Sequence, residues 1–126
     1  PPMNFLEGTV ASGAIDFGAF RLGLPSGHPA RAMEGKKVTA GVRPEDIYDS
    51  ANKCPVPVTD ANCFNAQVDV LEKLGAEDTA YLDASGLNLT ATLDPATRIE
   101  AGQRGKFAVD LERVHIFDSE SEQAIR

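Results

Sequence analysis

Alternation of apolar and polar residues dominates three segments of the chain. Between 64 and 70 every second residue is apolar, and the same period of two recurs over 87–93 and, less cleanly, over 107–111. Because successive side chains of a β-strand point to opposite faces, this pattern predicts strands with one buried and one solvent-facing side. The alternation breaks at Leu71, where we expect a β-bulge or a short helical turn.

Shorter apolar runs predict further strands. These runs cover 7–10, 14–17, 20–24, 37–42, 79–83 and 114–117. Ser-Gly, Asp-Pro and Ala-Gly pairs separate them, and such pairs favour turns. Many short strands at this spacing indicate a sandwich or a small barrel, so the predicted fold class is all-β.

The prolines and polar residues of 50–63 predict a connecting loop. It would join two strand-rich halves, residues 1–49 and 64–126, within a single domain of 126 residues. Closing a barrel from both halves would leave no exposed sheet edge. No internal repeat is evident in the sequence.

Helical structure is expected to be minimal, because no long stretch shows a helical stripe. One helical turn is predicted at 44–47, where Pro44 suits the first position, and another at 97–100. The polar tail, 119–126, is expected to fray.

Composition narrows the functional classes. The chain has 12 Lys+Arg and 19 Asp+Glu, a net charge of −7, and is 42% hydrophobic. It is therefore too apolar to be disordered and too acidic for non-specific nucleic-acid binding, which relies on clustered cations. No apolar run approaches the length of a membrane helix, and the first residues, 1–4, show no signal-peptide pattern and no initiator Met. We expect a piece cut from a longer chain.

One segment, Gly102–Phe107, resembles part of a phosphate-binding loop. That loop needs four residues between its glycines and a Ser or Thr after the lysine. Here two residues separate the glycines, and Phe107 follows the lysine. A turn that leads into a strand is therefore the favoured interpretation.

No catalytic or metal constellation stands out. His28 lies in a Pro/Gly loop context and His115 in a strand context. Neighbouring carboxylates are expected by chance among 19 acidic residues. Without a secretion signal, Cys54 and Cys63 are interpreted as reduced thiols, and the histidines are too distant in sequence to suggest zinc. A binding or assembly role is the default.

Four segments, taken together and in order, resemble one family. They are Pro2–Leu6, Gly41–Ile47, Val70–Glu77 with Tyr81, and Val114–Asp118 with Ala124-Ile125. The resemblance is to the C-terminal regulatory domain, or TOBE domain, of the ATP-binding subunits of maltose-transporter-type ABC importers. It covers nearly the whole chain.

This resemblance implies a small OB-fold-like (TOBE/MOP-like) β-barrel that is itself non-catalytic and holds no cofactor. ATP and Mg²⁺ would belong to a nucleotide-binding domain that is absent here. The implied partners are a second copy of the subunit, the membrane permease subunits and, in some members, a regulatory protein. The implied location is cytoplasmic and peripheral, on the inner face of the membrane, and the implied cargo is a sugar or a glycerol phosphate compound.

The matched motifs nominate individual residues. Gly41 and Gly75 are expected where a side chain would clash or where φ is positive, and Pro44 is expected to start a turn. Asn4 and Asp118 are motif positions with structural roles. The functional alternative places Arg43, Glu45 and Glu77 at a contact with a second copy or a regulator.

Two other functions stay open. The equivalent domain of a polyamine or iron importer is one. The other is a ligand-sensing module for a small anion or sugar, with a basic patch of Arg21, Arg31, Lys36 and Lys37 that could offset the net negative charge. No residue spacing suggests a stand-alone enzyme.

Overall fold

The computed structural model describes residues 2–126 and consists of two five-stranded antiparallel sheets. The first contains β1 (Asn4–Ala11), β2 (Ala14–Asp16), β3 (Arg21–Gly23), β4 (Lys37–Val42) and β10 (His115–Asp118). The second contains β5 (Ile47–Asp49), β6 (Cys63–Lys73), β7 (Asp78–Ala84), β8 (Leu87–Leu93) and β9 (Arg104–Val109). Pro1, the first residue of the predicted half 1–49, lies outside the described residues. Single 3₁₀ turns η1 (Pro29–Ala32), η2 (Pro44–Asp46) and η3 (Leu111–Arg113) complete the fold.

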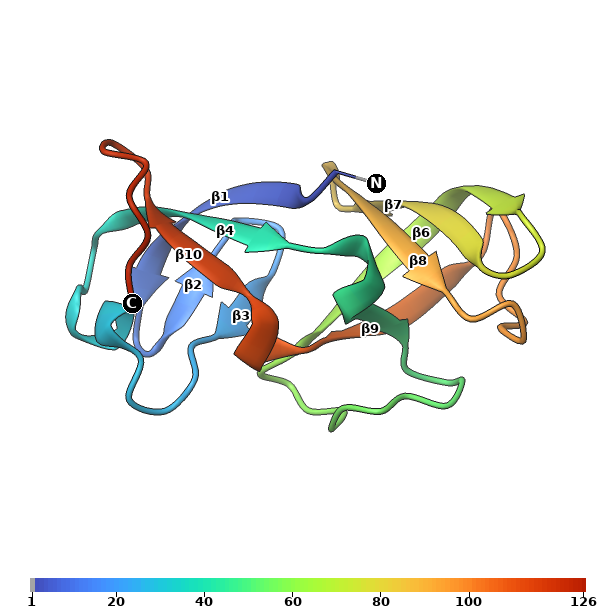
Figure 1. The fold of residues 1–126 in the computed structure, drawn as a ribbon, viewed down its shortest axis with the longest axis horizontal. Coiled ribbons are helices and arrows are strands. Elements are labelled where there is room, and N and C mark those ends of the chain that lie inside the picture. The colour runs from blue at the N-terminus through green and yellow to red at the C-terminus, as the bar shows by residue number, and fades with distance from the viewer. Residues whose placement is uncertain (1) are drawn as a thin grey trace.

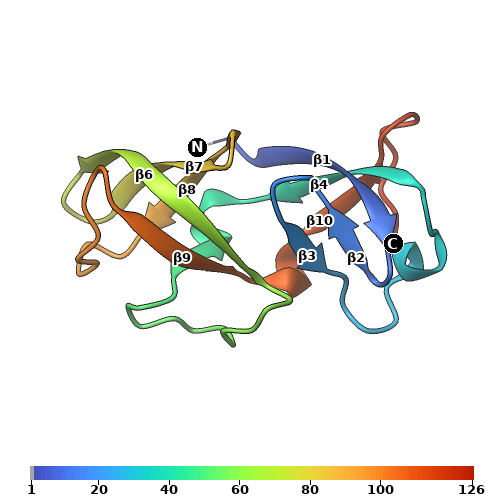
Figure 2. The ribbon, with the colours of Figure 1, turned by 180° about the vertical axis from the view of Figure 1, so that it is seen from behind.

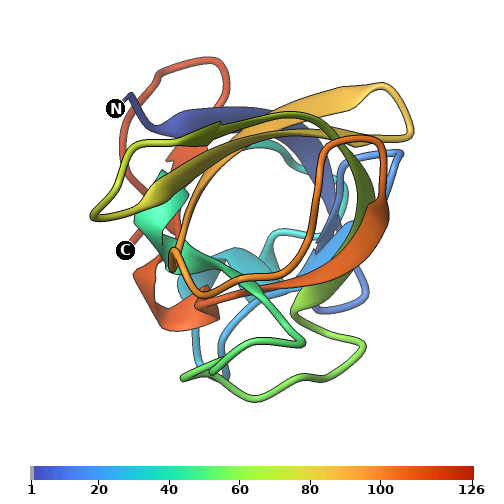
Figure 3. The same ribbon diagram turned by 90° about the vertical axis from the view of Figure 1, so that its right-hand side faces the viewer.

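The sheets lie end to end along the long axis and curl around it (Figures 1 and 3). This all-β, OB-fold-like architecture is the predicted fold class. The predicted strands at 37–42 and 87–93 coincide with β4 and β8. A bulge interrupts the β6–β7 register between Val68 and Val70, close to the predicted break.

Each sheet takes its outermost strand from the other half of the chain. The strand orders are β10-β4-β1-β2-β3 and β5-β9-β6-β7-β8. β5 follows β4 in sequence but pairs with β9, whereas β10 follows β9 and pairs with β4. The two halves therefore share one topology and exchange their last strands, as the crossing connections in Figures 1 and 2 show.

The core follows the alternation of the strands. In β8, Leu89, Ala91 and Leu93 are buried and the residues between them are partly exposed. A row of aromatic rings links the two sheets, because Phe20 stacks on Phe64 at 4.6 Å between centroids and Phe64 on Phe107 at 5.8 Å. Phe107 is fully buried, so this row fixes one sheet against the other.

Two hairpins end in glycine turns. Ser12 and Gly13 between β1 and β2, and Ser85 and Gly86 between β7 and β8, all have positive φ. Two consecutive residues of positive φ match the twist of the flanking strands.

Several sequence-based expectations were wrong. Residues 97–100 form no helical turn, because the chain turns earlier, where the Thr97 N–H donates to the Asp94 carbonyl oxygen at 2.9 Å. Leu111 lies in η3 rather than in a strand, since the Asp110 side chain accepts from the Glu112 N–H and starts a 3₁₀ turn. The strand β5 directly follows the predicted turn at Pro44 and was not anticipated.

The tail does not fray. The Ile125 N–H donates to the Ile116 carbonyl oxygen at 2.8 Å, and Ala124 forms a bridge with Phe117. The Ile125 side chain packs against the core. A turn with Glu122 at φ +61 returns the chain to β10, so an apolar anchor overrides the polar composition of the segment.

Candidate functional site

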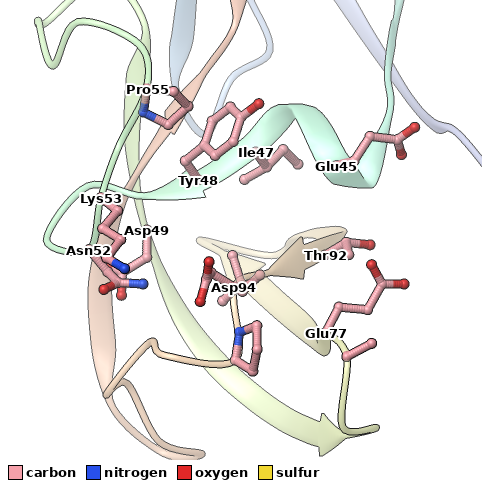
Figure 4. Close-up of a pocket in the computed structure, with 13 residues that line it drawn as sticks. Glu45, Ile47, Tyr48, Asp49, Asn52, Lys53, Pro55, Glu77, Thr92 and Asp94 are labelled. Atoms are coloured by element: carbon pink, nitrogen blue, oxygen red, sulfur yellow. The ribbon is translucent and has the colours of Figure 1, made fainter.

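A cavity of about 400 Å³ lies between η2 and β5 on one side and the ends of β7 and β8 on the other. Glu45 and Glu77 line it together, although 31 residues separate them in the chain. Figure 4 shows both carboxylates at one end of the cavity and Asn52 and Lys53 at the other. The fold thus brings together two of the three predicted contact residues.

Local structure fixes both positions. Pro44 is the first residue of η2, where its fixed φ suits the turn, and Glu45 is exposed directly after it. Gly75 lies in the connection between β6 and β7 with φ +96, a conformation that other residues rarely adopt. That turn orients the exposed Glu77 towards η2.

Arg43 lies apart from these two acids. It caps η2 in an extended conformation and makes no side-chain hydrogen bond to the cap. It does not line the cavity, and none of the four ion pairs found among residues 2–126 includes it. The half-buried guanidinium therefore keeps its charge available for a partner.

The cavity is rich in carboxylates. Asp49 and Asp94 join Glu45 and Glu77 along its walls, with Lys53 as the one cation among its lining residues. Burial and the nearby carboxylate of Asp46 raise the pKa of the Tyr48 phenol, so this phenol stays protonated and can donate a hydrogen bond. Within residues 2–126 no group of three or more His, Cys, Asp or Glu side chains is arranged to hold a metal ion.

Asn4 connects the two sheets. Its side-chain amide donates to the carbonyl oxygens of Val42 in β4 and Thr90 in β8, at 3.0 and 2.9 Å. Its Oδ1 accepts from the Thr90 N–H at 2.8 Å. Asn62 makes the corresponding contact in the second sheet, where its side-chain amide donates to the carbonyl oxygen of Val109, the last residue of β9. Both asparagines therefore fix the C-terminal end of the strand that precedes a 3₁₀ turn.

Gly41 allows close packing on β4. A Cβ at this position would collide with the Met3 sulfur and would lie 3.4 Å from a ring carbon of Phe117. Phe5 and Phe117 contact each other above it, with ring centroids 6.5 Å apart. Phe5 is 63% exposed and lines a groove with Phe117 and the β7–β8 turn.

Asp118 anchors the C-terminal turn to the first sheet. Its carboxylate pairs with Lys36 Nζ at 3.0 Å and accepts from the Glu120 N–H at 2.9 Å. The Lys36 hydrogen bond is the main cause that lowers the pKa of Asp118, and the Glu120 N–H adds to it.

Replacement of Asp118 by Asn should lower stability in a pH-dependent way. A carboxyl whose folded pKa is depressed contributes stability above its unfolded pKa of about 3.9 and loses it as the pH falls through the lower folded value. Urea unfolding of both proteins should therefore differ at pH 7 and converge in acid. A Glu120→Gln variant is the control, and a difference that persists below the folded pKa would contradict this role.

Three of the four cations in the basic patch expected for anion sensing have partners within the protein. Arg21 pairs with Asp16 at 3.2 Å, Lys36 pairs with Asp118, and Arg31 donates to the carbonyl oxygens of Gly13 and Leu24. Of the four, only Lys37 lacks a charged or side-chain hydrogen-bond partner among the described residues. Carboxylates therefore neutralise two of the four cations on which the anion-sensing hypothesis was based.

Sequence reasoning also missed three buried acids, Asp46, Asp49 and Asp78, of which Asp46 and Asp78 form ion pairs. Asp46 is 3% exposed and pairs with Arg113 Nε at 2.9 Å, while its second oxygen has no hydrogen-bond partner. Asp78 is 1% exposed and pairs with Lys73 at 3.1 Å. The alternation of β7 could have revealed Asp78, because it shares parity with Ala80 and Leu82.

Exposed apolar residues lie on β6, on β7 and in the turn that leads to Glu77. Val70 and Tyr81 face each other across β6 and β7 and are 50% and 42% exposed. Leu74, at the turn, is 65% exposed. The Tyr81 hydroxyl donates to Glu72 at 2.8 Å, which raises its pKa. We call Val70, Leu74 and Tyr81 the β6–β7 patch.

No helix among residues 2–126 has the length and apolar character needed to span a membrane.

Comparison with known proteins gives consistent matches. Residues 1–47 match the family model described as the MalK OB fold domain. The chain is 35% identical over 130 residues to the trehalose/maltose import ATP-binding protein MalK of Thermococcus litoralis, and 34% identical over 130 residues to the oligosaccharides import ATP-binding protein MsmX of Bacillus subtilis. These alignments cover 99% and 100% of this chain but 35% of each relative.

A third relative is the sn-glycerol-3-phosphate import ATP-binding protein UgpC of Chromobacterium violaceum, 35% identical over 104 residues. That match covers 82% of this chain and 26% of the relative. Among solved structures, the cytoplasmic molybdate-binding protein ModG with molybdate bound superposes with a TM-score of 0.70 at 17% identity, over 90% of this chain and 94% of that one. At this identity the likeness concerns the fold alone.

Proposed function

Because this chain is an OB-fold domain of the type that ends the ATP-binding subunits of sugar importers, we propose that it serves as the regulatory and dimerisation domain of such a subunit. The resemblance inferred from the four sequence motifs is thereby confirmed. The match of nearly the whole chain to about a third of each import protein is the observation that carries the proposal.

The parent subunit would hydrolyse ATP to drive solute import, together with membrane permease subunits, at the cytoplasmic face of the membrane. ATP and Mg²⁺ would be bound by a separate nucleotide-binding domain. The segment Gly102–Phe107 does not fit that chemistry, because Gly102 has φ +89 in a turn and Arg104 already begins β9. We propose that residues 1–126 are non-catalytic and hold no cofactor.

Sugars or glycerol phosphates are the proposed cargo. The names of three relatives refer to trehalose and maltose, oligosaccharides, and sn-glycerol 3-phosphate. None of the three names a polyamine or iron, so they favour the sugar importer over those alternatives.

The proposed contact with a second subunit or a regulatory protein centres on the β6–β7 patch and Glu77. Exposed apolar side chains that adjoin a charged rim are typical of interaction sites. Glu45 lines the acidic cavity together with Glu77. Arg43, which caps the same 3₁₀ turn, takes part in none of the ion pairs found among residues 2–126. A permanent contact here would keep two subunits together while their motor domains separate, which raises the effective concentration of each for the other.

The test uses the intact subunit in its own cells. Leu74→Ser combined with Glu77→Lys should reduce both cross-linking between subunits and uptake of labelled sugar, by about tenfold if the contact controls assembly. Glu120→Lys, which reverses an exposed charge on the C-terminal turn, is the matched control. Full cross-linking and uptake in the double variant, at unchanged protein level, would refute the proposed contact.

A further inference from the structure

A second cavity, of about 430 Å³, lies beside β9 and has the opposite charge from the first. Arg98, Arg104 and Lys106 line it, together with the polar side chains of Asn52 and Gln103. Within residues 2–126 none of these three cations takes part in an ion pair. In a chain of net charge −7, three unpaired cations around one cavity are a local reversal of the overall charge.

The position of the cations is set by the sheet. Arg104 and Lys106 are two residues apart on β9 and therefore point to the same face. On the neighbouring strand β6, Arg104 pairs with Gln67 and Lys106 pairs with Asn65. Asn65, Arg104 and Lys106 also line a neighbouring hollow of about 310 Å³, so the cationic surface continues along the sheet.

The segment that carries Arg98 is held against β6 and β9. The Gly102 N–H donates to the Val68 carbonyl oxygen at 2.7 Å, and the Val68 N–H donates to that of Gln103 at 2.8 Å. A Cβ on Gly105 would lie only 2.5 Å from the Ile99 side chain, so the absence of that Cβ lets Ile99 pack on the backbone of β9. Arg98 is thereby presented on an anchored loop.

The lining contains one carboxylate, Asp49, and each of its two oxygens already accepts a hydrogen bond. It is 9% exposed and accepts from the Thr97 hydroxyl at 2.5 Å and from the Ala51 N–H at 3.0 Å. None of the four ion pairs found among residues 2–126 joins Asp49 to Arg98, Arg104 or Lys106. A phosphate monoester carries a charge of about −1.5 to −2. One guanidinium group can donate two parallel hydrogen bonds to two of its oxygens.

We propose that this cavity binds the phosphate group of a small phosphorylated metabolite, with Arg98, Arg104 and Lys106 as its ligands. The volume suits a compound of sugar-phosphate size, within the usual range of about 300–1,000 Å³ for small-molecule sites. The side chains, and not a glycine-rich loop, supply the charge. The inference rests on these residues and is independent of the importer role, although it supplies a ligand class for the sensing alternative.

The test is a titration of the ¹⁵N-labelled chain with glucose 6-phosphate, with glucose as the unphosphorylated control. Saturable shifts are expected at the amides of Arg98, Gln103, Arg104 and Lys106, with a Kd below about 10 mM. Arg104→Ala with Lys106→Ala should weaken binding by about tenfold or more. The matched control, Arg21→Ala with Lys37→Ala, removes the same charge elsewhere and should change the Kd by less than about twofold.

Parallel titrations with inorganic phosphate and with anionic lipid vesicles show which kind of phosphate compound binds. Glucose 6-phosphate that binds more tightly than inorganic phosphate supports a metabolite site. Equal affinities for glucose 6-phosphate and inorganic phosphate would overturn the proposal that the site recognises a phosphate ester. If the control variant weakens binding as much as the Arg104/Lys106 variant does, the binding depends only on net charge, and the proposed ligands are wrong. Binding to vesicles with anionic lipids, without saturable shifts by the sugar phosphate, would overturn the proposal in favour of a membrane surface.

Discussion

Replacement of Asn62 by alanine is expected to lower the free energy of unfolding by about 3–4 kcal/mol. The Asn62 side chain is 4% exposed and makes four hydrogen bonds with nitrogen or oxygen partners, and its Oδ1 also accepts a long one from the Cys63 thiol. Its amide donates to the carbonyl oxygens of Pro57 and Val109, and its Oδ1 accepts from the backbone N–H and the hydroxyl of Thr59. Alanine would leave several of these groups unpaired, with little access to water.

Thermal and urea unfolding should both report this loss, as a decrease of about 10 °C or more in Tm. Asn4→Ala removes three comparable bonds at the matching point of the other sheet, but that side chain is only half-buried, so water can replace part of the loss. The control is Asn65→Ala on the exposed face of β6. If Asn62→Ala destabilises no more than Asn65→Ala, the loop 50–63 does not depend on this side chain.

Removal of Arg113 is expected to be the second most damaging change, at about 2–4 kcal/mol. Its partner Asp46 is 3% exposed, and one oxygen of that carboxylate already lacks a hydrogen bond. Arg113→Ala would leave a buried carboxylate with no cation, and breaking such a pair costs more than the pair itself contributes. The side chain of Arg113 is 54% exposed, so water offsets part of the cost.

The double variant Asp46→Ala with Arg113→Ala separates the two effects. It removes the buried charge together with its partner, so the double variant should be more stable than Arg113→Ala alone when both are unfolded in urea. Arg113→Lys should keep most of the stability. A double variant less stable than the single one would mean that Asp46 does not depend on Arg113 for its burial.

The sequence was most informative where alternation was regular. β8 coincides with its predicted range because every second residue there faces the core. β4 also coincides, although it was predicted from a short apolar run and its last three residues are all buried. β5 was missed because three residues after a proline turn are too few to show a period. One of those residues, Asp49, is polar yet almost fully buried, which hides the pattern further.

The candidate surfaces could be predicted only in part. The motif resemblance nominated Glu45 and Glu77, and the fold places both on one cavity. Their proximity depends on how η2 meets the β6–β7 turn, which no local pattern encodes. The ion pairs within the basic patch could not be predicted for the same reason, because the partner of Lys36 is Asp118, 82 residues further along the chain.

The exchange of last strands predicts how the molecule responds to a cut. The loop between β5 and β6 runs along the surface and contains exposed residues that a protease could reach. After cleavage there, the N-terminal piece would still supply β5 to the second sheet, and the C-terminal piece would still supply β10 to the first. The two pieces should therefore remain together as a non-covalent heterodimer, and each expressed alone should complete its fold only when the other is added.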